Sequence, residues 1–176
     1  MKTVSLGMAV TPFGVHNMAQ IEFVGIDKYF KQLDKLGKYS IGLCKRALYD
    51  GAAVVANSVR AEVNALPTSD RDAKKGEAQP ILSYEKDGLV EGLGVAKMKD
   101  EHGVIYTRID FDGYNRLKSK KYPSGHPNSM VARAINSGTS KRRKNPFMTR
   151  GVNKGRAQSQ AAMAARMDAD IEEIMK

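Results

Sequence analysis

Residues 40–64, SIGLCKRALYDGAAVVANSVRAEVN, carry the strongest periodic pattern in the chain. Their apolar positions recur at steps of three and four residues, which places them along one face of an α-helix. Ser40 can cap the first turn of this helix, and Pro67 stops it shortly after its end. The pattern predicts a long helix with a buried face made of Ile41, Cys44, Leu48, Ala52, Val55, Val59 and Val63.

Upstream of this stretch, the sequence predicts a strand and a further helix. Apolar residues recur at helical spacing from Ile26 onwards, and Gly37 is expected to end or bend this helix. Before it, residues 20–24 alternate polar and apolar side chains and are rich in β-forming residues, which is typical of a short strand. The order up to Asn64 is therefore strand, helix, long helix.

Downstream, the sequence predicts a long loop and then a β-hairpin. Residues 68–80 are polar and charged, which indicates a loop. Two runs rich in β-forming residues follow at 89–98 and 104–111, joined by five residues, so we expect an antiparallel pair. In the second run one face is expected to pack on the helix, namely Ile105, Thr107, Ile109 and Phe111.

Two more helices complete the predicted fold. A short one over 130–136 follows Pro127 and ends at Gly138. A last one opens at Phe147, with Gly151 and Gly155 interrupting its early part and an apolar stripe further on made of Met163, Met167, Ile171 and Ile174. The fold class is therefore α+β: a long helix packed on a small antiparallel sheet (hairpin plus short strand), with a C-terminal helix and long basic loops.

Charge is distributed unevenly along the 176 residues, which carry a formal net charge of +10. Residues 113–167 contain no Asp or Glu but thirteen Lys and Arg. A run of one sign needs counter-charge from outside the chain, either phosphate or an acidic protein surface; the alternative is a solvated loop set that keeps the protein soluble. The candidates for a partner or DNA interface are Lys120, Lys121, Lys141, Arg142, Arg143, Lys144 and Arg150.

Several function classes lack the residues they need. The longest apolar run has five residues, far short of the roughly twenty that span a membrane. One cysteine and three scattered histidines give no disulfide and no zinc-ligand spacing, so a cytosolic protein without metal or cofactor is expected. No common catalytic motif is present. Asp110 and Asp112 on one strand face, or His126, could serve a small hydrolase, but strand-end solvation and turn formation are the favoured roles.

Four segments in this order carry a resemblance: FVGIDKYFKQLDKLGK, ALYDGAAVVANSVRAEVNALP, FDGYN and HPNSMVARAINSGTSKRRKNPFMTRGVNK. Together they resemble the Hong Kong 97-type gene 10 product family of tailed phages, which are tail-completion or head–tail joining minor tail proteins related to the lambda minor tail protein Z. The resemblance covers residues 19–176. Its most specific part is Gly138, Thr139 and Ser140, followed by basic residues and then Pro146 and Phe147; Gly113 and Tyr114 also belong to the shared motifs.

The resemblance also divides the chain. Members commonly begin close to a strand that resembles Met18 to Phe23. Residues 1–17 are therefore expected to be an N-terminal extension or the product of a misassigned start site, and residues 18–176 one tail-completion-like domain. The resemblance implies a non-enzymatic structural protein that completes the head-proximal end of the tail and supports head–tail joining as part of a ring. It implies a place in the virion after assembly in the host bacterial cytoplasm, with no membrane.

The implied partners are other neck and tail proteins, namely a tail terminator and a head–tail connector or stopper, together with further copies of this chain in a homo-oligomeric ring. On this reading Phe147 is a contact residue at the join between loop and terminal helix, and a charged replacement would block incorporation without unfolding the monomer. The alternative function is a non-specific nucleic-acid-binding basic protein, and contact with phage DNA is compatible with both readings.

Overall fold

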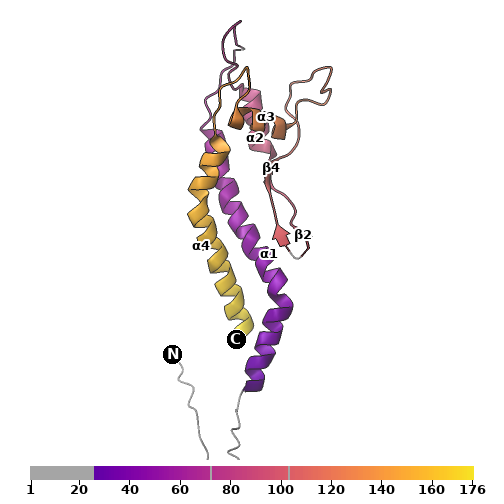
Figure 1. Cartoon of the computed structure of the whole chain (residues 1–176), viewed down its shortest axis with the longest axis vertical. Helices are drawn as coiled ribbons and strands as arrows, with labels where there is room; N and C mark the ends of the chain where they lie inside the picture. Colours follow the sequence, from indigo (N-terminus) through magenta and orange to yellow (C-terminus); the bar gives the residue numbers. More distant parts are fainter. Residues whose placement is uncertain (1–25, 72, 103) are drawn as a thin grey trace, which may run out of the picture.

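Two long helices lie side by side, with two smaller helices at one end and the short strands beside one of the long helices (Figure 1). The structure is a computed structural model that describes residues 26–71, 73–102 and 104–176. α1 spans Ile26–Asn64 and α4 spans Phe147–Met175, and the two run in opposite directions. The strand predicted at 20–24 and the N-terminal extension at 1–17 lie outside the described residues.

The smaller elements are two helices and four short strands. α2 (Ser83–Gly92) and α3 (Asn128–Ser137) lie beside each other at the end of the molecule where α1 stops (Figure 1). This region is called the α2–α3 end below. β1 pairs with β4 and β2 with β3, both antiparallel, with Leu93 opposite Phe111. The predicted α+β class is confirmed. The bounds are α2 Ser83–Gly92, β1 Leu93–Val95, β2 Lys99–Glu101, β3 Val104–Tyr106, β4 Ile109–Phe111 and α3 Asn128–Ser137.

α1 is one continuous helix, so the predicted break at Gly37 is wrong. The hydroxyl of Ser40 donates a hydrogen bond to the carbonyl of Gly37 at 2.9 Å inside the helix, and Ser40 is therefore not an N-cap. Packing against the end of α4 offsets the roughly 1 kcal/mol that a mid-helix glycine costs. The side chain of Gln32 donates to the carbonyl of Met175, and Arg46 pairs with Asp170 at 2.9 Å.

The buried face of α1 follows the prediction only in its second half. Val59 and Val63 are buried in the core as expected. In the first half Ile41 is 53% exposed and Cys44 is exposed, which corrects the predicted burial of both; Leu43 and Ala47 are buried in their place. The reason is that α4 packs on the other face of α1: Gly51, one turn after Ala47, lies against Met163 and Ser159 of α4.

Glycines bring the two long helices into close contact. A Cβ atom on Gly151 would lie 2.7 Å from the Cα of Val59, and one on Gly155 would lie 2.8 Å from the hydroxyl oxygen of Ser58. Both glycines are buried and α4 continues through them, so they do not interrupt the helix as predicted. The helix propensity that they lose is offset by backbone contact that a larger residue would prevent.

The hairpin is present but shorter than predicted. Residues 89–92 belong to α2, and the predicted connection at 99–101 is strand β2. Leu89 is fully buried in the core, which stabilises helix rather than strand at this point. The face prediction holds in β4, where Phe111 is buried and Ile109 packs against the core.

The core lies where α1, α3, α4 and β4 meet, and Phe147 stands in it with no exposed surface. Its ring meets that of Phe111 edge to face, with centroids 6.0 Å apart. Phe147 does stand at the join between the preceding loop and α4, but it is a core residue, so the expectation that a charged replacement leaves the monomer folded is wrong. The predicted short helix and its end are confirmed, because α3 stops at Gly138 with φ +77°.

Candidate functional site

A compact basic loop connects α3 to α4. Gly138 adopts a positive φ, and a Cβ there would lie 3.0 Å from the backbone nitrogen of Lys144. Thr139 and Arg142 exchange backbone hydrogen bonds of 2.9 and 3.3 Å across a tight turn, with exposed Ser140 at its tip. Pro146 then precedes the first residue of α4. The motif residues of this segment therefore shape the loop that presents the basic cluster.

The four basic residues of this loop have different surroundings, and Arg142 faces the interior. Its side chain is 6% exposed, and its guanidinium donates to both carboxylate oxygens of Glu85 at 2.9 Å and to the carbonyl of Pro80 at 3.2 Å. Arg142 is therefore a structural residue, which corrects its prediction as an interface residue. Lys141, Arg143 and Lys144 are exposed.

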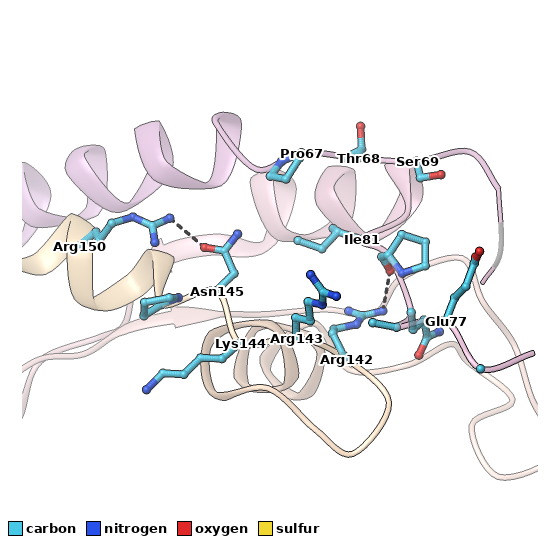
Figure 2. Close-up of a pocket in the computed structure, with 15 residues that line it drawn as sticks. Pro67, Thr68, Ser69, Glu77, Ile81, Arg142, Arg143, Lys144, Asn145 and Arg150 are labelled. Carbon is cyan, nitrogen blue, oxygen red and sulfur yellow. Dashed lines mark hydrogen bonds between the residues drawn. The ribbon is translucent and has the colours of Figure 1, made fainter. Parts of the chain in front are cut away.

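A cleft with a volume of about 800 Å³ separates the basic loop from the loop that follows α1. One wall carries Pro67, Pro80 and Ile81, and the other carries residues 142–146 and Arg150. Figure 2 shows Arg143 pointing across toward Ile81, whereas Lys144 points away from that wall. The walls are tied together because the backbone N–H of Gln79 donates to the carbonyl of Lys141 at 2.7 Å. This space is called the basic cleft below.

Arg150 lies at the α1 end of the basic cleft and is held by a buried carboxylate. Its Nε donates to Glu62 at 2.7 Å, and its Nη2 donates to the side-chain oxygen of Asn145 at 2.9 Å. Lys154 reaches the other oxygen of Glu62 at 2.5 Å. One carboxylate thus pairs with two cations, and this end of the cleft keeps a net positive charge. These hydrogen bonds, from Lys154 first and then Arg150, lower the pKa of Glu62.

Glu62 should make stability fall in acid. The pKa of Glu62 in the folded chain lies below the ordinary value of 4.5, so on acidification the unfolded chain takes up a proton first. The stabilisation from the Glu62 ion pairs is therefore present above about pH 4.5 and is lost as the pH falls through the folded pKa. We expect Glu62→Gln to lose less stability than wild type between about pH 6 and pH 3 in urea unfolding. Glu173→Gln, an exposed glutamate of α4, controls for removing a carboxylate. Parallel pH profiles for wild type and Glu62→Gln would contradict the assignment.

The other predicted basic candidates lie in a different loop. Lys120 and Lys121 are exposed in the loop between β4 and α3, which Figure 1 shows apart from the loop that opens α4. Gly113 opens this loop with φ +77°, and its carbonyl accepts the backbone N–H of Asn128 at 3.0 Å. Tyr114 is 61% exposed. The candidate cations therefore occupy two surfaces and not one.

Most cations of the acid-free segment have no carboxylate partner. Arg142, Arg150, Lys154 and Arg166 form ion pairs. Within the part of the chain that the structure describes, the other nine form none, and all nine are exposed. They are Arg116, Lys118, Lys120, Lys121, Arg133, Lys141, Arg143, Lys144 and Arg156. The described residues therefore supply a carboxylate partner to four of the thirteen cations.

The weak catalytic candidates have ordinary local roles. Asp110 and Asp112 each accept the backbone N–H of the following residue at 2.8 Å, which is typical of strand ends and turns. The ring of His126 packs on Tyr122 with centroids 4.7 Å apart. Among the described residues, no cluster of His, Cys, Asp and Glu side chains is suited to holding a metal ion.

Sequence reasoning missed Glu85 and Asn128. Glu85 accepts the backbone N–H of Leu82 at 3.0 Å, and a glutamate three residues into a helix is a recognisable N-terminal signal. Asn128 is buried, and its amide nitrogen donates to the carbonyl of Asp112 at 2.7 Å, joining the two ends of the 113–127 loop. Only its place directly after Pro127 pointed to it.

None of the helices in the described ranges is long and apolar enough to cross a membrane. Comparisons of the chain with protein-family models, with curated proteins and with solved structures find no match.

Proposed function

We propose that this protein is a structural component of a phage neck, which completes the head-proximal end of the tail and supports head–tail joining in a ring assembly. The observation that carries the proposal is the set of nine exposed basic residues without a carboxylate partner among the described residues. Eight of them lie at the α2–α3 end of the molecule, in α3 or in the loops on either side of it. These two basic surfaces suit acidic neighbours or DNA, either of which a ring component at a neck would meet.

The packing of the molecule supports a structural role. Its two long helices pack together through close glycine contacts, and the α2–α3 end is joined to these helices through one shared core. The residues considered for catalysis are engaged in local turns and ring packing. The motif residues Gly138, Thr139 and Pro146 shape the basic loop that connects α3 to α4. The residues on which the resemblance rests therefore have a structural role in this chain.

The proposal is tested in the parent phage or prophage with this gene stopped early. Electron microscopy of the lysate is expected to show DNA-filled heads beside unattached full-length tails. Supplying the wild-type gene in trans is the control, and it should restore joined particles. Normal infectious particles without the gene product would overturn the proposal.

The same nine cations favour a second candidate function, non-specific nucleic-acid binding. Neutralising Lys141, Arg143 and Lys144 to glutamine should then flatten the dependence of log K on log salt by about two to three units for duplex DNA. Arg142 is left unchanged because it is buried. The same change at Lys31, Lys35 and Lys38, near the opposite end of α1, is the control (Figure 1). No detectable binding at physiological salt would remove this candidate.

A further inference from the structure

The basic cleft has the chemistry of a peptide-binding groove. Its wall after α1 includes the apolar residues Pro67, Pro80 and Ile81. Its other wall presents the exposed Arg143, whose guanidinium points toward Ile81 (Figure 2). Among the described residues Arg143 forms no ion pair or side-chain hydrogen bond. A planar guanidinium of this kind binds a carboxylate through two parallel hydrogen bonds.

The cleft is firm enough to serve as a preformed site. The Gln79–Lys141 backbone hydrogen bond ties its walls, and the buried Arg142–Glu85 ion pair anchors the basic loop to α2 beneath it. Arg150 at one end is fixed by Glu62 and Asn145. A preformed groove lowers the entropy that a partner must lose on binding.

Two features favour a protein ligand over nucleic acid. Among the described residues that line the cleft none is aromatic, whereas single-stranded nucleic acid sites stack bases on aromatic rings. The prolines and Ile81 offer contact to the apolar side chains of a peptide, which a sugar–phosphate chain does not have.

We propose that the basic cleft binds an extended acidic segment of a partner protein, with a Glu or Asp carboxylate on Arg143 and a neighbouring apolar residue against Pro67 and Pro80. This inference names the partner chemistry of the proposed joining role and rests on it for the source of the segment. The binding itself is measured on the purified full chain. Failure of this proposal leaves the neck function open to its own test in the phage, and failure of the neck function leaves the binding result intact.

The probe is a short fluorescein-labelled peptide of alternating glutamate and proline, followed by fluorescence anisotropy at physiological salt. We expect the wild-type chain to bind it and to ignore the matching glutamine–proline peptide. Arg143→Glu and Pro67→Glu, one on each wall, should each weaken binding by about tenfold or more. Lys121→Glu makes the same charge change as Arg143→Glu in the other basic loop and should alter binding by less than about twofold.

Circular dichroism and thermal unfolding of each variant establish that it is folded; Arg143, Pro67 and Lys121 are all exposed, so no loss of fold is expected. Absence of binding by the wild type, or equal weakening by Lys121→Glu, would overturn the proposal. A labelled oligothymidylate serves as the competing ligand. If its binding depends on Arg143 while the binding of the peptide does not, the cleft is a nucleic-acid surface and the proposal is wrong.

Discussion

Replacing Phe147 with alanine is expected to lower the free energy of unfolding by about 3–5 kcal/mol. The side chain has no exposed surface and stands among residues of α1, α3 and β4, with its ring against the edge of Phe111. Truncation removes the buried ring and leaves a cavity that surrounding helices fill only in part. Urea denaturation followed by circular dichroism measures the loss.

Phe30→Ala is the matched control for this prediction. Phe30 is the same residue type but is 58% exposed near the start of α1, so its truncation should change stability by no more than about 0.5 kcal/mol. Phe147→Leu keeps part of the buried volume and should fall between the two. A loss for Phe147→Ala that equals that for Phe30→Ala would show that Phe147 does not stand in the core.

The position of Phe147 also changes how particle assembly must be tested. A charged side chain there would be buried without a partner, and the chain would unfold before any contact with a neighbour could be lost. Failure of such a variant to enter particles would therefore say nothing about an interface. Exposed residues at the α2–α3 end of the molecule, such as Arg143, are the informative positions for such a test.

Periodicity predicted the long helices better than it predicted what they bury. In the first half of α1 two apolar stripes compete, one with Ile41 and Cys44 and the other with Leu43 and Ala47. Both have helical spacing, and α4, which lies far along the chain, determines which of them is covered. The choice depends on tertiary contacts that a single helix pattern does not contain.

α2 escaped prediction because its sequence is a weak helix former. Its ten residues include Gly88 and Gly92, each of which costs about 1 kcal/mol in a helix. The helix forms because Leu89 is buried and because glycine is required where Asn128 and Asp112 approach. A Cβ on Gly92 would lie 2.2 Å from the carbonyl oxygen of Asp112. Tertiary packing thus overrides local propensity here.

Charge counting located the basic segment but did not assign roles within it. Arg142 and Arg143 are neighbours of the same type, yet one is buried on Glu85 and the other points into the basic cleft (Figure 2). The difference depends on α2, which was not predicted, and on the tight turn between Thr139 and Arg142. The sequence around Pro67 and Pro80 has no motif that predicts a binding surface. These residues line the basic cleft only because the loop after α1 packs opposite the basic loop.

Breaking the Arg142–Glu85 ion pair from either side is expected to cost about 3–5 kcal/mol of unfolding free energy. Arg142→Met leaves the Glu85 carboxylate buried with only the backbone N–H of Leu82 as a partner. Glu85→Leu leaves the guanidinium buried with only the carbonyl of Pro80. Each single variant thus leaves one buried charge without its ionic partner. Urea denaturation should therefore show a large loss of unfolding free energy in both variants.

The double variant Arg142→Met with Glu85→Leu separates stranded charge from lost packing. It removes both charges together and strands neither, so its loss should be no larger than that of either single variant, which corresponds to a coupling of about 3 kcal/mol or more. Arg143→Met, the exposed neighbour, should change stability by no more than about 0.5 kcal/mol. Additive losses in the cycle would mean that the two side chains act independently. A coupled result instead shows that this pair fixes the basic loop, because it joins the loop to α2 under the basic cleft and leaves Arg143 as the cation that points into the cleft.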